Sequence, residues 1–158
     1  HIIKTFCDQA AINDMIRWHY EIDTYCQQKQ IASRHFMEAV FYQKTNMDRY
    51  YADYAKNNNL PTLPIVADKR AKPKKEQRLL ALTSHFESGK VFFNEAEKEN
   101  RHTINLIAQL LAFNPPRKTQ VDGIDALEGA IFLLKNSTLN YINPISIVKK
   151  KQNTGKYY

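Results

Sequence analysis

Apolar and polar residues alternate along this chain with two different periods. In five segments the apolar residues recur every three or four positions, as at Ile12, Met15 and Ile16, which is the spacing of a helix that buries one face. Shorter segments rich in apolar and aromatic residues are typical of strands. The predicted helices are Ala11–Gln28, Thr45–Asn57, Lys74–Ser88, Glu95–Leu111 and Gln120–Lys135, and the predicted strands are His1–Cys7, Ile31–Gln43, Thr62–Ala67 and Val91–Phe93.

The order of these elements predicts the fold class. Strands and helices alternate through most of the chain, which predicts an α/β fold with a sheet covered by helices. Pro64 within the third strand indicates an edge position or a bulge. We expect residues 1–135 to form one domain and residues 136–158 to form a basic polar tail, since few core-forming residues follow Lys135.

Composition narrows the class of protein. A chain of 158 residues with 43% hydrophobic content suits a single packed domain. There is no signal peptide at the start and no apolar run of the roughly 18 to 20 residues that cross a bilayer, so we expect a soluble, intracellular protein. Cys7 and Cys26 have no metal-ligand spacing and are expected to be reduced core residues.

Two aspartates provide the first candidate chemistry. Asp122 and Asp125 lie three residues apart, so they project from one face of the last predicted helix, while Ile124 and Leu127 on the opposite face would pack on the sheet. Like charges at this spacing repel unless a cation lies between them. The pair is therefore a candidate divalent-metal site; helix capping and interaction with the helix dipole are the alternative, and Glu128 is expected to be solvated.

A third carboxylate lies within a predicted strand. Glu38 is surrounded in sequence by Phe36, Met37, Val40 and Phe41, and burying an unpaired carboxylate among such residues is costly. Metal coordination would compensate for that cost. The alternative is a solvated glutamate on a half-exposed strand face.

Basic residues supply a possible DNA contact. The net charge of +7 favours a polyanionic partner, although the Lys149–Lys151 tail and the run from Lys69 to Arg78 supply much of it. Lys75 and Arg78 lie at the start of a predicted helix, where they could hold a DNA phosphate. The alternative is that Lys69–Lys75 is an ordinary exposed loop.

Three stretches carry a resemblance to a known family. They are Phe36–Gln43 (FMEAVFYQ), Lys75–Leu82 (KEQRLLAL) together with Phe86–Phe93, and Leu110–Asn114 leading to Val121–Leu127 (VDGIDAL). In this order and spacing the chain resembles the C-terminal nuclease domain of phage terminase large subunits, the headful endonuclease of the DNA-packaging motor. The resemblance spans about residues 1 to 135 and implies an RNase H-like mixed sheet flanked by helices.

The resemblance implies a metal-dependent cut of double-stranded DNA concatemers. Glu38 matches the family's second acid, Asp125 its third, and Asp122 the accessory acid or histidine one turn earlier. Two Mg²⁺ or Mn²⁺ ions would activate a water and stabilise the leaving 3′ oxygen. The family's first acid lies on an opening strand that we expect to precede His1; Asp8 is a candidate substitute, and turn or capping chemistry is its alternative role.

The resemblance also bears on partners and on competing functions. It implies double-stranded DNA, the portal and the small terminase subunit as partners, and the cytoplasm of a bacterial host as the location, without a membrane partner. The family's ATPase motor is absent from this sequence, which has no phosphate-binding loop of the form G-x-x-x-x-G-K-[ST]. Two alternatives stay open: a non-catalytic DNA- or portal-docking module, and a resolvase or transposase relative.

Overall fold

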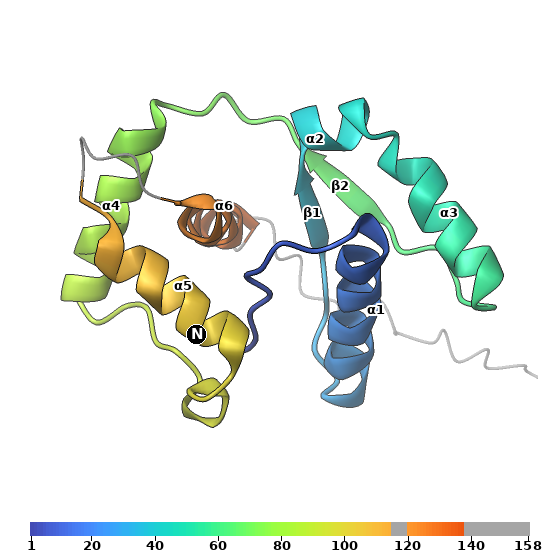
Figure 1. Cartoon of the computed structure of the whole chain (residues 1–158), viewed down its shortest axis with the longest axis horizontal. Coiled ribbons are helices and arrows are strands. Elements are labelled where there is room, and N and C mark those ends of the chain that lie inside the picture. Colours follow the sequence, from blue (N-terminus) through green and yellow to red (C-terminus); the bar gives the residue numbers. More distant parts are fainter. Residues whose placement is uncertain (115–119, 138–158) are drawn as a thin grey trace, which may run out of the picture.

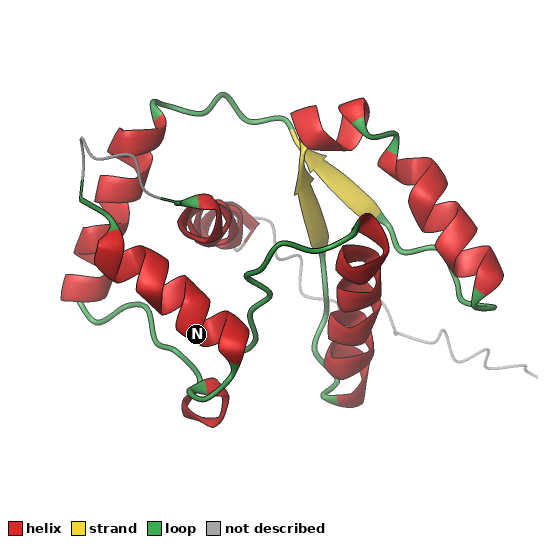
Figure 2. Ribbon diagram, in the orientation of Figure 1, coloured by secondary structure: helices red, strands yellow, loops and turns green. Residues whose placement is uncertain are grey.

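The chain is a mixed α/β structure in which helices flank a small parallel sheet (Figures 1 and 2). The computed structural model describes residues 1–114 and 120–137, so the predicted tail lies outside the described residues from residue 138 onward. The elements are α1 (Ile12–Gln28), β1 (His35–Glu38), α2 (Ala39–Lys44), α3 (Met47–Asn57), β2 (Ile65–Asp68), α4 (Lys75–Glu87), the 3₁₀ helix η1 (Glu95–Glu97), α5 (Arg101–Ala112) and α6 (Asp122–Ser137).

The sheet consists of β1 and β2, which run parallel with His35 opposite Ile65 and Glu38 opposite Asp68. A parallel pair needs a crossover connection, which α2 and α3 provide. Because the strands are parallel and in register, both end on a carboxylate at the same edge of the sheet. Side chains at paired positions also project from the same face. The sheet therefore brings Glu38 and Asp68 together.

One hydrophobic core lies between α1, α3 and the sheet. Ile16, Met47 and Tyr51 are its largest fully buried side chains, and Ala55 extends the buried stripe of α3. Met47, Tyr51 and Ala55 recur every four residues, which places them on one face of the helix. This core fixes β1, and with it the position of Glu38.

A second core joins α4, α5 and α6. Leu79, Leu82 and Ile124 are its buried members. Gly123 allows α6 to lie close to the extended residues 1–7 and to α5. A Cβ atom at this position would lie 2.9 Å from the Sγ atom of Cys7 and 2.9 Å from the Oε1 atom of Gln109. The second core therefore fixes α6 relative to α4, the two helices that carry most of the candidate site residues.

The predicted strand Ile31–Gln43 is wrong beyond Glu38. Only His35–Glu38 form β1, and Ala39–Lys44 turn at once into α2. The physical reason is that β2 ends at Asp68, opposite Glu38, so no neighbouring strand is present to bond the backbone further along. A helix satisfies those backbone groups locally.

The predicted strands before α1 and between α4 and η1 also differ from the structure. In place of two strands, His1–Cys7 and Val91–Phe93 share a single parallel bridge between Ile2 and Phe93. The predicted helix Glu95–Leu111 is divided into η1 and α5, because Asn94 and Asn100 each accept a backbone hydrogen bond at a new helix start. The remaining predicted helices agree with α1, α3, α4 and α6 within a few residues.

Within residues 1–114 and 120–137, none of the helices has the length and apolar character required to cross a membrane.

Candidate functional site

Five carboxylates from three parts of the chain form ion pairs with cations of the β2–α4 region. One network connects four of these carboxylates, and Glu38 pairs separately with Lys72. We call this group, together with its four paired cations, the carboxylate cluster. Its acids are Glu38 at the end of β1, Asp68 at the end of β2, and Asp122, Asp125 and Glu128 on α6, and its cations are Arg70, Lys72, Lys75 and Arg78. The cations lie in the β2–α4 loop and the first turn of α4, between the sheet edge and α6.

Arg78 connects α4 to α6. Its side chain is 8% exposed, and its Nη1 atom donates to Asp125 Oδ1 at 2.7 Å and to Glu128 Oε2 at 2.6 Å. Its Nε atom donates to the carbonyl oxygen of Pro73 at 3.2 Å. A buried guanidinium with these partners fixes the orientation of both carboxylates.

Arg70 connects α6 to the sheet. Its Nη1 and Nη2 atoms donate to the two carboxylate oxygens of Glu128 at 3.2 and 2.9 Å, and its Nε atom donates to Asp68 Oδ2 at 3.0 Å. The guanidinium carbon also lies 4.3 Å from the ring centroid of Phe132, a cation–π contact. Asp68 and Glu128 are therefore held by one arginine.

The two lysines make looser pairs. Lys72 Nζ donates to Glu38 Oε1 at 2.9 Å. Lys75 Nζ lies 3.5 Å from Asp125 Oδ2 and 3.7 Å from Asp122 Oδ1. The Lys75 side chain is 42% exposed and that of Asp122 is 83% exposed, so this edge of the cluster is open to solvent.

The charges of the cluster keep Asp125 ionised. Burial raises the pKa of this carboxyl, but the hydrogen bond and charge of Arg78, together with the charges of Lys75 and Lys72, lower it overall. Burial lowers the pKa of Arg78, and the hydrogen bonds to Asp125 and Glu128 outweigh that effect and raise it. Asp125 is therefore a carboxylate at neutral pH, with cations on several sides.

Glu38, Asp122 and Asp125, the three acids predicted from the sequence, all pair with cations of the carboxylate cluster, whereas the candidate substitute Asp8 does not. Lys72 pairs with Glu38, and its charge also lowers the pKa of Asp125. The cation between Asp122 and Asp125 is the ammonium of Lys75. Asp8 lies apart from the cluster and pairs with Arg101 at the start of α5.

Sequence reasoning missed four members of the cluster, the acids Asp68 and Glu128 and the loop cations Arg70 and Lys72. Asp68 was signalled by its place directly after a short apolar strand, where parallel strands gather polar side chains. Glu128 was expected to be solvated, yet its side chain is 12% exposed and paired with two arginines. Arg70 carried no signal of its own, because it looked like one of several loop cations.

The donor chemistry of the cluster is that of a site for hard cations. Carboxylate oxygens suit Mg²⁺ and Mn²⁺. Among the described residues, however, no group of three or more His, Cys, Asp or Glu side chains is close enough together to hold a metal ion. The places between the carboxylates are taken by the cations of the protein itself, of which Lys72 and Lys75 are the most exposed.

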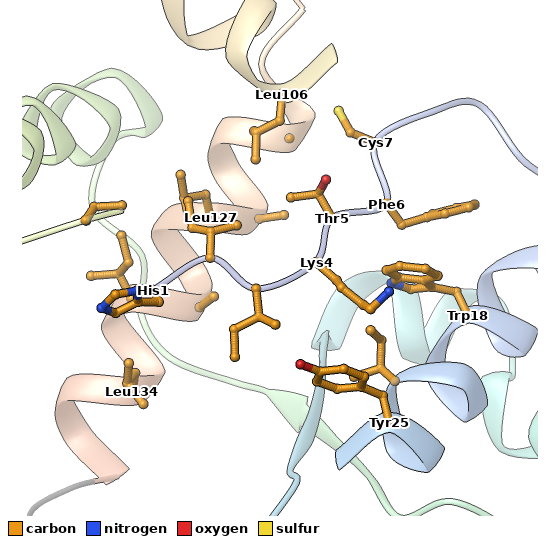
Figure 3. A pocket seen from close by; sticks show the side chains of 18 of the residues that line it. His1, Lys4, Thr5, Phe6, Cys7, Trp18, Tyr25, Leu106, Leu127 and Leu134 are labelled. Carbon is orange, nitrogen blue, oxygen red and sulfur yellow. The ribbon is translucent and has the colours of Figure 1, made fainter. Parts of the chain in front are cut away.

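A separate apolar cavity of about 640 Å³ lies on the other side of α6. Figure 3 shows the extended first segment crossing it, with Leu127 and Leu134 of α6 on one side and Trp18 and Tyr25 of α1 on the other. The residues found to line it include no Asp or Glu, and burial, together with the charge of Asp122, raises the pKa of the Cys7 thiol at its edge. The carboxylate chemistry therefore belongs to the opposite face of the helix.

Comparisons with known proteins supply no relative for this arrangement. No family model matches the chain, and no significant match to it was found among curated proteins or solved structures. The carboxylate cluster and the sequence motifs are the basis on which a function can be proposed.

Proposed function

We propose that this chain is a divalent-metal-dependent endonuclease domain of the phage terminase large-subunit type, with an RNase H-like fold, that cuts double-stranded DNA. One observation carries the proposal: Lys72 pairs with Glu38 at the end of β1, and its charge also acts on Asp125 of α6, so one cation is near both of the acids that the sequence predicts for such a site. Carboxylates from a strand end and a facing helix are suited to share a hard cation.

Glu38 and Asp125 would hold Mg²⁺ or Mn²⁺, with Asp122 as an accessory ligand at the exposed edge. Such ions supply an activated water and stabilise the leaving oxygen of a phosphodiester. The contribution of the other residues is positional. Arg78 holds Asp125 and Glu128 at hydrogen-bond distance, and Arg70 ties Glu128 to the sheet edge.

The proposed partners follow from this activity. Double-stranded DNA is the substrate, and the portal and the small terminase subunit are the proposed protein partners of the intact packaging machine in the bacterial cytoplasm. The charge supports the DNA partner, since +7 on a chain of this size favours a polyanion.

Plasmid cleavage tests the proposal. Nicking and linearisation would be measured in Mn²⁺, Mg²⁺ and EDTA for the wild type, Asp125→Asn and the control Asp53→Asn, which removes an exposed acid of α3 paired with Arg49. We expect cleavage only with metal, a loss of about 100-fold or more in Asp125→Asn because a metal ligand loses its charge, and no change in the control. Circular dichroism would verify that all three proteins are folded.

A second function is favoured by the ion pairs of Asp125. Arg78 and Lys75 already bond or approach both of its oxygens, as in a structural network without a metal. A non-catalytic DNA- or portal-docking module would show binding that survives EDTA and no cleavage in Mn²⁺. A resolvase or transposase relative would instead prefer branched or end-specific DNA over a plasmid.

A further inference from the structure

Six cations lie between residues 69 and 78, and they fall into two groups. Arg70, Lys72, Lys75 and Arg78 are the paired cations of the carboxylate cluster. Lys69 and Lys74 are exposed, and neither ammonium forms an ion pair or hydrogen bond with any residue in the described part of the chain. Both lie in the loop between β2 and α4, beside the cluster. They are the two cations of this region that are available to a ligand.

The charge balance explains why two unpaired lysines matter here. The five carboxylates of the cluster exceed its four cations by one charge, and Glu76 in the first turn of α4 adds another negative charge. Lys69 and Lys74 offset both charges. Without them a DNA duplex approaching the acids would meet a negative surface, which lowers both the association rate and the affinity.

We propose that Lys69 and Lys74 contact the phosphates of duplex DNA and so bring the backbone to the carboxylate cluster. This inference rests on the proposed function, which supplies the DNA substrate, and it assigns the phosphate contact to residues other than Arg78. Arg78 is 8% exposed and engaged with two carboxylates, so turning it to a phosphate would break both pairs. Lys75 is shared between Asp122 and Asp125.

The spacing of the two lysines suits a phosphate backbone. Lys74 follows Lys69 by five positions, so their Cα atoms lie at most about 18 Å apart. The two ammonium groups can therefore reach phosphates within about five base pairs of one another along a duplex, whose rise is about 3.4 Å per base pair. Exposed ammonium groups on long stems recognise phosphate charge and carry no base specificity, so we expect binding that is nearly independent of sequence.

Duplex binding in EDTA tests this inference separately from cleavage. Fluorescence anisotropy of a labelled duplex of about 20 base pairs would be measured across a salt series for the wild type, Lys69→Gln/Lys74→Gln and the control Lys29→Gln/Lys56→Gln. The control removes two exposed lysines near the ends of α1 and α3, so both double variants lose the same charge. We expect the loop variant to bind roughly tenfold more weakly or worse near 0.1 M salt, and its slope of log K against log salt to be smaller by about 1.8. The control should keep the wild-type slope.

Each outcome is decisive. A loop variant that binds like the wild type, an equal loss in both double variants, or a wild type that does not bind the duplex would overturn the assignment. Displacement of the duplex by phosphatidylserine–phosphatidylcholine vesicles at lower concentration than by unlabelled duplex would identify a membrane surface as the partner and overturn it too. Binding that depends on Lys69 and Lys74, without cleavage in Mn²⁺, would support this inference and reject the nuclease. Cleavage together with binding that does not depend on these lysines would support the nuclease and reject this inference.

Discussion

The arginines and the lysines of the carboxylate cluster neutralise neighbouring acids in different ways. Arg70 and Arg78 have side chains 12% and 8% exposed, and each bonds two carboxylates, Arg70 from β2 and α6 and Arg78 from α6 alone. Lys72 and Lys75 have side chains 22% and 42% exposed and make one short pair and two long ones. The arginine pairs are thus part of the packed structure, whereas the lysine pairs lie at its solvent edge.

This difference indicates which cations can move. A planar guanidinium fixed by several hydrogen bonds is costly to displace, because its partly buried acids would lose their closest partner. An ammonium on a flexible stem is strongly hydrated and exchanges its partner easily. Lys72 and Lys75 are therefore the cations that can turn aside when a ligand enters, while Arg70 and Arg78 keep Asp125 and Glu128 in place.

The largest effect is expected from Arg78→Met. The substitution keeps an apolar stem but leaves Asp125 and Glu128 without their shared cation, with side chains 22% and 12% exposed. We expect the free energy of unfolding to fall by about 2 kcal/mol, since two partly buried carboxylates lose their shortest charged hydrogen bonds and keep only Arg70 and Lys75 as partners. Urea unfolding monitored by circular dichroism measures this change.

The matched control is Arg17→Met on the exposed face of α1. Arg17 pairs with Asp14 and Glu21, but its side chain is 60% exposed. We expect a loss of at most about 0.5 kcal/mol, as for other exposed pairs. Equal losses in the two variants would show that Arg78 is no more important than a surface arginine, and the comparison between arginine and lysine pairs would fail.

A smaller effect is expected from acid. The pKa of Asp125 is lowered in the folded chain, because Arg78, Lys75 and Lys72 together outweigh the raising effect of burial. The unfolded chain binds this proton more readily, so the stabilisation is fully present above the ordinary aspartate pKa of about 3.9 and is lost as pH falls through the folded value. The free energy of unfolding of the wild type should therefore drop more steeply below about pH 4 than that of Asp125→Asn.

Urea titrations of both proteins at a series of pH values from neutral to strongly acidic would give the two slopes. Parallel curves would mean that Asp125 gains nothing from its cations in the folded state. The arginine pair would then be a geometric contact without an energetic role, and Arg78 would have to act through its packing alone.

Periodicity predicted most of the helices, whereas for the sheet it predicted the places of β1 and β2 but not their extent. The apolar stripes of α1, α3, α4 and α6 depend on residues within each segment, so the sequence contains the required information. A strand depends on its partner, and the aromatic run after Glu38 continues into α2 because no strand lies beside it. The extent of a strand was therefore decided by a contact that local pattern does not encode.

The acids of the candidate site were predictable where their spacing in a helix, or their position among apolar residues, is visible in the sequence. Asp122 and Asp125 share a helix face by spacing alone, and Glu38 stood out as an acid among apolar residues. The pairing of Arg78 with Asp125 joins α4 to α6 through tertiary packing, so sequence suggested a phosphate contact instead. Glu128 was misjudged for the same reason, since the partners that bury it are far away in sequence.

The smallest effects are expected from Lys72→Gln and Lys75→Gln. These variants test the lysine pairs, as Arg78→Met tests the arginine pairs. Each substitution removes an ammonium at the solvent edge, and the carboxylate left behind can be hydrated, since Glu38 and Asp122 have side chains 54% and 83% exposed. We expect the free energy of unfolding to change by at most about 0.5 kcal/mol, and the difference to shrink in about 1 M salt as exposed charges are screened. The same urea titrations measure both values. A loss comparable to that of Arg78→Met would mean that the lysines are as firmly built into the fold as the arginines, and that no cation of the carboxylate cluster is free to give way to a ligand.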